Sequence, residues 1–351
     1  MNTQLDLLDS GNSRLFSLPL LTADMIRYRF AAPATLKRNI MKLISYTRNG
    51  YTSFGILKSD QIIDIPTLWP GPNNPRNLLE LLWADENLEK TRDLALKADT
   101  FIPLQQVRLL APIARPGKII ALAGNYADHI KESGRALGLS DAPRQTTTPR
   151  PFLMPSTCII GPNDVIPWPV YSEQIDYELE LAIVIGKTAK CVSPAQAINY
   201  IAGYTIANDV SARSVTYKAN RAARPWDEFY DWLNGKWADG FCPIGPAIVT
   251  KDQIPDPAAL NMHLTVNGKI RQQASAGQMI YSPADTVSFV SHIMTLEPGD
   301  IIATGTPKGV AMATGQWLEP GDVIECTIDA IGTLRNTLGT RPAQFYRPLE
   351  T

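Results

Sequence analysis

The stretch IDYELELAIVIG, residues 175–186, decides what kind of fold this chain has. Apolar and acidic residues alternate through its first half, a pattern typical of a β-strand because successive side chains point to opposite faces. One face is apolar, and the other carries Asp176, Glu178 and Glu180. Alternate residues lie about 7 Å apart along a strand, so two or three carboxylates share one rigid surface.

The acidic face of this strand has two interpretations. Like charges held this closely raise one another's pKa unless a cation lies between them, and ligands that are all oxygen favour Mg²⁺ or Mn²⁺, with Ca²⁺ as a third candidate. The alternative is an edge strand whose acidic face meets water. A second strand-like segment, residues 204–208, is followed by Asp209, which either supplies a third ligand or caps a turn.

Composition argues against several classes of partner. The chain has 351 residues and a formal net charge of −1, so no global charge favours nucleic acid or an anionic membrane. No apolar run approaches the roughly 18 residues of a membrane helix. The four cysteines form no CxxC pair, which favours free thiols in a reducing compartment, and we expect a cytoplasmic protein. With only three histidines, a metal site must rely on carboxylates.

The chain divides into three parts by pattern. Residues 1–40 lack a secretory signal, and we expect a poorly ordered extension, with a targeting segment as the weaker alternative. Residues 41–112 combine strand signals around Asn49-Gly50 with a helical stretch at 78–97, which predicts a small N-terminal α+β domain. Residues 113–345 hold mainly strands, with helices expected from Ser193 to Gly203 and from Ser282 to about Thr295. The predicted fold is α+β, mainly β, with a mixed sheet.

A short helix is expected after the apolar strand at residues 119–122. Asn125 can cap it, and His129 and Glu132 then lie three residues apart on one face. A carboxylate there fixes the imidazole tautomer and raises its basicity, which makes His129 a candidate general base. An incidental ion pair on a solvated helix face is the alternative.

Several segments occur together in the order of one known family. DYELELAIVIG is followed by YTIANDVSAR, NGKWADGFCPIGP, IIATGTPKGVAM and LEPGDVIECTIDAIGTLRN. Together with NYADH they resemble the fumarylacetoacetate hydrolase (FAH) superfamily over roughly residues 112–336. The resemblance implies an FAH-like mixed β-sandwich roll as the catalytic domain, and a homodimer.

The resemblance also implies a metal centre and an acid–base pair. Glu178, Glu180 and Asp209 match the family's metal ligands. His129 and Glu132 match a dyad that activates water.

Further residues match positions that handle the substrate. Lys236 matches an active-site lysine that would stabilise an enolate. Arg213 is similar to an arginine that either faces the substrate or holds the metal carboxylates. Thr306, in the GTPKG loop, and Tyr126, in NYADH, are the other candidates for substrate contact.

Two positions depart from the family pattern. Met154 stands in FLMPS where members often have lysine, and Thr216 stands where glutamine is common. Both changes would remove polar contacts from the site, so no specific substrate can be carried over.

The leading hypothesis is a metal-dependent hydrolase that cleaves a carbon–carbon bond in a 2,4-dioxo acid. Its substrate would be an acylpyruvate or a fumarylpyruvate-like product of aromatic ring cleavage. The alternative is an isomerase, tautomerase or decarboxylase of a 2-oxo or 2-hydroxydienoic acid, of the oxaloacetate or hydroxymuconate type. A metal-stabilised binding protein without catalysis is the rival from another class.

Overall fold

The computed structural model describes residues 41–137, 144–215, 217–218 and 221–345, with side chains left out at 133–137. The predicted extension at 1–40 lies outside these residues. Strand β1 (Lys42–Arg48) pairs with β2 (Tyr51–Lys58), and β2 pairs with β3 (Gln61–Asp64). Asn49 and Gly50 both have positive φ between β1 and β2, which confirms the predicted tight hairpin turn.

The helical stretch predicted at 78–97 is two helices, α2 (Leu78–Ala84) and α3 (Glu89–Leu96). The one-turn helix α1 (Ile65–Leu68) precedes them, and β4 (Ile102–Pro103) and β5 (Arg108–Leu110) follow. Strand β1 also pairs with β14 (Cys242–Thr250), so residues 41–112 share a sheet with the rest of the chain. A domain boundary at residue 112 stays a prediction.

The large mixed sheet holds the strand on which the fold prediction rests. Its strand order is β4-β3-β2-β1-β14-β12-β11-β17-β6-β7, with β5 paired to β1 and β8 (Ile159–Ile160) paired to β14. The remaining strands are β12 (Ile201–Asn208), β11 (Leu179–Ile185), β17 (Ile301–Ala303), β6 (Ile119–Leu122) and β7 (Pro151–Met154). β11 lies between β12 and β17, so the edge-strand interpretation is wrong.

A five-stranded sheet covers one face of β11. Its order is β16 (Lys269–Ser275), β15 (Asn261–Val266), β18 (Val323–Ile328), β19 (Gly332–Leu338) and β9 (Val165–Ile166). Leu181 and Ile183 of β11 belong to the core that includes apolar residues of this sheet. Ala182 and Val184 belong instead to a second core with residues of β1 and β2. The predicted alternation is therefore present, but both faces are buried. The single strand predicted over residues 175–186 is two strands, β10 (Ile175–Asp176) and β11, and β10 pairs with β13 (Ser211–Ala212).

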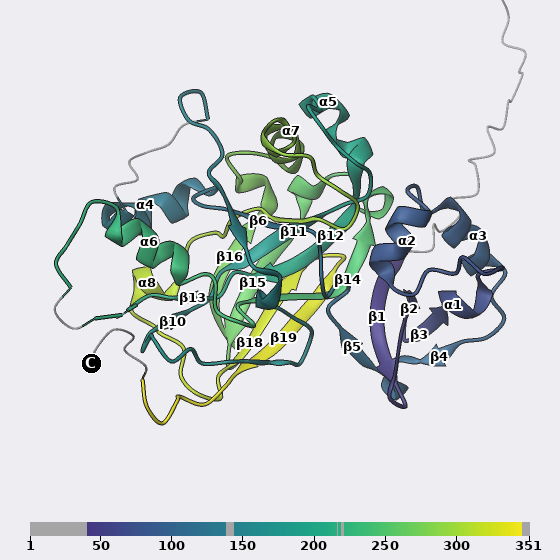
Figure 1. Cartoon of the computed structure of the whole chain (residues 1–351), viewed down its shortest axis with the longest axis horizontal. Coiled ribbons are helices and arrows are strands. Elements are labelled where there is room, and N and C mark those ends of the chain that lie inside the picture. Colours follow the sequence, from purple (N-terminus) through teal and green to yellow (C-terminus); the bar gives the residue numbers. More distant parts are fainter. Residues whose placement is uncertain (1–40, 138–143, 216, 219–220, 346–351) are drawn as a thin grey trace, which may run out of the picture. The chain divides into compact units, whose positions relative to one another are not determined.

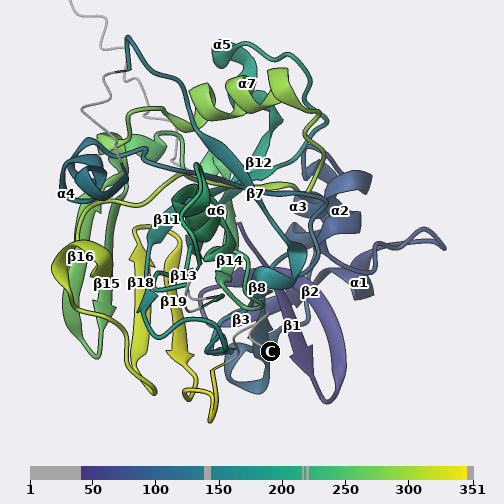
Figure 2. The ribbon, with the colours of Figure 1, turned by 60° about the vertical axis from the view of Figure 1, so that its left-hand side comes forward.

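The helices lie around the sheets, as Figures 1 and 2 show, and the fold is α+β, mainly β. Besides α1, α2 and α3, they are α4 (Ala127–Leu137), α5 (Pro194–Ala197), α6 (Asp227–Asn234), α7 (Pro283–Ile293) and α8 (Ala311–Thr314). α7 starts at the predicted place because Ser282 and Asp285 form a capping box. Among the described residues, no helix has the length and apolarity needed to cross a membrane.

The helix predicted from Ser193 to Gly203 is shorter in the structure. α5 stops at Ala197 and continues only as a short 3-10 turn to Tyr200. Gly203, expected as the C-terminal cap, lies inside β12. A Cβ there would be 2.2 Å from the carbonyl oxygen of Val249, so this glycine permits close approach of β14 and does not end a helix.

Candidate metal centre and active site

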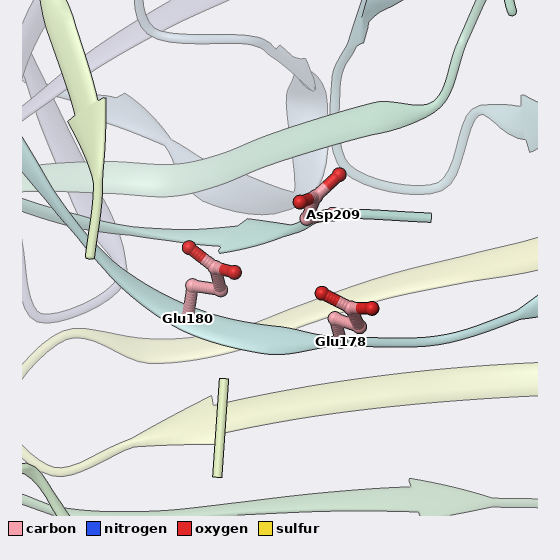
Figure 3. Close-up of side chains that lie close together, drawn as sticks. All are labelled: Glu178, Glu180 and Asp209. Atoms are coloured by element: carbon pink, nitrogen blue, oxygen red, sulfur yellow. The ribbon is translucent and has the colours of Figure 1, made fainter. Parts of the chain in front are cut away.

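Three carboxylates converge where β11 and β12 meet. Glu180 lies in β11, Glu178 precedes the same strand, and Asp209 follows β12. The antiparallel register pairs Leu179 with Asn208, which brings these positions together. One oxygen from each carboxylate lies within 4.8 Å of the others, and Figure 3 shows the three groups facing a common space.

The chemistry of these residues fits a divalent cation. All three are buried, and neither Glu180 Oε1 nor Asp209 Oδ1 has a hydrogen-bond partner among the described residues. Lys236 and Arg213 form ion pairs with Glu178, Asp209 and the buried Asp176. With Glu180 included, four ionised carboxylates exceed these two cations by two negative charges. A divalent metal ion would neutralise that charge and bond the orphaned oxygens.

The carboxylates differ in acidity because their neighbours differ. Burial raises the pKa of Glu180 well above its usual range, and the charges of Asp209 and Glu178 raise it further. Burial also raises the pKa of Asp209, to about 6, although Lys236 opposes that shift. Burial would raise the pKa of Glu178 too, but Lys236 and Arg213 outweigh it and lower the pKa to about 2.

Lys236 lies directly against the cluster. Its ammonium is 2.9 Å from Glu178 Oε2 and 2.8 Å from Asp209 Oδ2, and the side chain is 1% exposed. The sequence places it just after α6, whose last turn is followed by Gly235. Burial lowers the pKa of Lys236, but the two carboxylates overcome this and raise it above its usual value. Lys236 therefore stays charged beside the metal ligands.

Arg213 holds protein carboxylates. Its Nε donates to Asp176 Oδ2 at 3.0 Å, and its Nη2 donates to Glu178 Oε1. Of the two roles implied by the resemblance, the structure places it in the second, although the side chain also lines the cleft described below.

Asp176 organises this corner, and sequence reasoning counted it only as part of the acidic face. It accepts the Arg213 bond and also bonds from the backbone N–H groups of Ala311, at 2.5 Å, and Met312, at 3.2 Å. The carboxylate thus ties the start of α8 to the metal cluster. Its place on the same strand face as Glu178 was the only signal in the sequence.

His129 and Glu132 lie on one face of α4, as predicted. His129 Nδ1 is 3.5 Å from Glu132 Oε1, and that oxygen also accepts a bond of 2.7 Å from the backbone N–H of Gly309. Asn125 was predicted to cap this helix, but its side chain forms its hydrogen bonds elsewhere. Its amide donates to the carbonyls of Tyr281 and Thr304, and its oxygen accepts from Tyr281 N.

The two remaining substrate candidates differ in position. The Thr306 hydroxyl lines the cleft but is engaged, since it donates to Leu179 O at 3.0 Å and accepts from Gln272 Nε2 at 2.9 Å. The buried Tyr126 hydroxyl donates to Met262 Sδ at 3.4 Å, and Tyr126 does not line the cleft. Substrate contact by either residue stays a prediction.

Buried Gln272 is a site residue that sequence reasoning missed. Besides its bond to Thr306, it donates to Pro307 O and accepts from Leu179 N. The backbone of the GTPKG loop binds a protein carboxylate, because Gly305 N donates to Glu180 Oε2 at 2.7 Å. No pattern in the sequence marks Gln272, since its partners lie far away in the chain.

Several of these side chains line one cleft. Its polar lining includes His129, Thr306 and part of the metal cluster, and its apolar lining includes Phe152, Trp232 and Met312. Met154 does not line it, because this side chain packs in the core with β1 and β2. The expected loss of a polar contact at Met154 is therefore not seen in the cleft, and Thr216 lies outside the described residues.

The fold and the cleft together are those of an enzyme with a cluster of carboxylates that could hold a divalent metal. Residues 118–339 match the family model described as fumarylacetoacetate (FAA) hydrolase C-terminal, and the chain belongs to this family. It is 38% identical over 278 residues, covering 78% of this chain and 83% of the relative, to "Oxaloacetate tautomerase Fahd2a, mitochondrial" of Rattus norvegicus.

Two solved structures share the fold. The 2-hydroxyhepta-2,4-diene-1,7-dioate isomerase of Mycobacterium marinum is 33% identical with a TM-score of 0.64, covering 87% of this chain and 100% of that one. The maleylpyruvate hydrolase of Sphingobium sp. SYK-6, in complex with manganese(II) and pyruvate, is 30% identical with a TM-score of 0.67, covering 86% and 100%.

Proposed function

We propose that this protein catalyses metal-dependent keto–enol isomerisation of a 2-oxo acid, with oxaloacetate as the first candidate substrate. The observation that carries the proposal is the buried triad, two of whose carboxylates, Glu178 and Asp209, line one cleft with His129 and Lys236. Relatives named as a tautomerase and an isomerase support isomerisation over the hydrolysis favoured by the motifs alone. Mg²⁺ or Mn²⁺ is the proposed metal.

The proposed mechanism moves one proton. Glu178, Glu180 and Asp209 would hold a divalent cation, which when bound would supply Lewis-acid polarisation of the 2-oxo acid. His129 removes a proton from the carbon beside the 2-oxo group, and Glu132 holds the imidazole in position. The 2-oxo oxygen gains negative charge as that proton leaves, and the nearby Lys236 ammonium offsets it. Return of the proton to the oxygen gives the enol, and the reverse path gives the ketone.

Hydrolysis of a 2,4-dioxo acid is the second candidate. The likeness to a maleylpyruvate hydrolase with bound pyruvate favours it. Here His129 would deprotonate water, the carbon–carbon bond would break, and the products would be a 2-oxo acid and a carboxylic acid. This reaction would place the protein in the degradation of aromatic compounds, whereas isomerisation of oxaloacetate would not.

A direct assay separates these reactions. Enol-oxaloacetate is diluted into buffer with Mn²⁺ and the loss of its ultraviolet absorbance is followed, while pyruvate release is measured from an acylpyruvate. We expect fast isomerisation that a chelator abolishes, and a loss of about 100-fold or more in kcat for His129→Ala. Chelator-insensitive turnover, or an unchanged kcat in His129→Ala, would contradict the mechanism. Acylpyruvate cleavage without isomerisation would establish the second candidate.

The location in the cell and the oligomeric state complete the proposal. We propose a cytoplasmic homodimer, although the relative from Rattus norvegicus carries "mitochondrial" in its name. A fluorescent protein fused after residues 1–40 tests the location, and light scattering of the full chain tests the dimer. Import of the fusion into mitochondria, or a monomeric mass, would contradict the respective part.

A further inference from the structure

Two aromatic rings form one wall of the cleft. Phe152 of β7 and Trp232 of α6 meet edge to face, with ring centroids 5.0 Å apart and an interplanar angle of 69°. Both line the cleft that contains Glu178, Asp209 and Lys236. The Lys236 ammonium lies 5.9 Å from the centroid of the Trp232 ring, so the wall borders the proposed metal centre directly.

The surrounding contacts hold the wall in place before any ligand binds. Phe229 stacks on Trp232 with centroids 5.9 Å apart. Trp237 Nε1 donates to Leu153 O at 3.0 Å, which fastens the segment after α6 to β7. Rings held on two secondary structure elements lose little conformational freedom when a ligand arrives, so their contact area contributes efficiently to affinity.

The lining beside this wall is apolar, and the permanent cations that line the cleft lie at the proposed metal centre. Among the described residues that line it, the two permanent cations already face carboxylates: Arg213 binds Asp176 and Glu178, and Lys236 binds Glu178 and Asp209. The neighbouring lining is apolar and includes Ile130, Leu122 and Met312.

We propose that the Phe152–Trp232 wall determines specificity by binding the distal end of the substrate, and that it favours 2-oxo acids with a flat distal group. Such a group places its face or edge against the two rings and displaces water from apolar surface. This inference rests on the proposed function, since the 2-oxo carboxylate end must lie at the metal for the distal end to reach the wall. It adds aryl and alkenyl 2-oxo acids to oxaloacetate as candidate ligands.

Two non-covalent probes test the wall. Pyruvate and phenylglyoxylate are both monoanionic 2-oxo acids, and they differ in a methyl against a phenyl group. Their affinities are measured by calorimetry on the full chain with Mn²⁺. We expect tighter binding of phenylglyoxylate by the unaltered protein. Trp232→Ala should lower that affinity about tenfold and leave pyruvate affinity within about twofold, as loss of one aromatic contact predicts. Phe152→Leu, which keeps apolar volume, should shift the ratio in the same direction.

Trp226→Ala is the matched control. Trp226 contacts Phe229 in the same row of aromatic residues but is 73% exposed and does not line the cleft, so its loss should leave the ratio unchanged. Equal losses for both acids in Trp232→Ala, or a wild-type preference for pyruvate, would overturn the proposal. If Trp232→Ala fails to fold, Phe152→Leu decides by the same ratio.

The outcome is distinguishable from that of the proposed function. If the wall substitutions change the affinity ratio but no 2-oxo acid is isomerised, the proposed reaction is wrong and the role of the wall is supported. If 2-oxo acids are isomerised but neither wall substitution changes the ratio of the two affinities, the proposed reaction is supported and the role of the wall is wrong.

Discussion

Glu180 shows why the metal centre is costly without its ion. Its side chain is fully buried, one oxygen accepts from Gly305 N, and the other has no partner among the described residues. A buried carboxylate in this state opposes folding unless it binds a proton or a cation.

Glu180→Gln should therefore separate stability from metal binding. The amide carries no charge, so we expect the metal-free protein to gain about 1–3 kcal/mol in free energy of unfolding. Affinity for Mn²⁺ should fall by more than about 100-fold. Denaturant unfolding with a chelator and calorimetry with Mn²⁺ measure the two effects. Glu325→Gln on β18 is the control, because its side chain is 39% exposed and faces Arg335. A less stable metal-free Glu180→Gln protein would contradict this account.

Metal affinity should depend on pH, and the sign follows from the raised pKa values. Burial raises the pKa of Glu180 well above normal and that of Asp209 to about 6, so lowering the pH puts protons on oxygens that the cation needs. Binding must then release protons, and Mn²⁺ affinity should fall as pH decreases from about 7 to 5, by up to about tenfold per unit for each proton displaced. Calorimetry in buffers of different ionisation enthalpy counts those protons. Constant affinity over this range would show that the carboxylates are already ionised without metal.

At the scale of elements, the loop between β17 and α8 connects the metal centre to the acid–base pair. Gly305 N holds Glu180 and Gly309 N holds Glu132, so one short loop positions a metal ligand and the orienting carboxylate of His129. Gly309 has φ of +103°, and a Cβ there would lie 2.2 Å from the carbonyl oxygen of Arg271 on β16. The backbone of this loop therefore requires glycine.

Gly309→Ala should displace the loop and weaken catalysis. We expect a loss of about 1–3 kcal/mol in free energy of unfolding and a lower kcat, because Glu132 loses its anchor. Gly315→Ala is the matched control, since Gly315 also has positive φ (+72°) but no atom lies within 4 Å of its Cβ position. It should cost about 1 kcal/mol and preserve kcat. Comparable kcat values in the two variants would show that the Gly309 contact does not position Glu132.

At the scale of the whole molecule, the metal ligands belong to the middle of the large sheet. β11 and β12 are neighbours there, and β11 contributes side chains to two hydrophobic cores. An ion that joins these strands therefore acts on the cooperative unit and not on a peripheral loop.

Removal of metal should lower the melting temperature of the full chain. At a free Mn²⁺ concentration of about 100 times Kd, binding stabilises the native state by about 2.7 kcal/mol. Thermal unfolding followed by circular dichroism, with Mn²⁺ or with chelator, measures the shift, and Glu180→Gln should lack it. A wild-type melting temperature that is the same in both conditions would contradict a specific metal centre.

The sequence by itself determined the features that depend on neighbours along the chain. The period of two in residues 175–186 predicted which side chains of β11 share a face, and Ser282 with Asp285 predicted the start of α7. The spacing of Glu178 and Glu180, and of His129 and Glu132, follows from the same local geometry. For Asp209 the local pattern allowed either a third ligand or a turn cap, and only the resemblance to the FAH superfamily favoured the ligand.

Only the tertiary structure decided which distant groups meet. Gly203 is a sheet residue because β14 passes close to it, and Asn125 bridges two loops although its local pattern predicted a cap. Arg213 faces Asp176 and Glu178, and Phe152 faces Trp232, across large separations in sequence. Such contacts depend on how the sheets and helices pack, and side-chain patterns along one segment carry no information about the partner that another segment supplies.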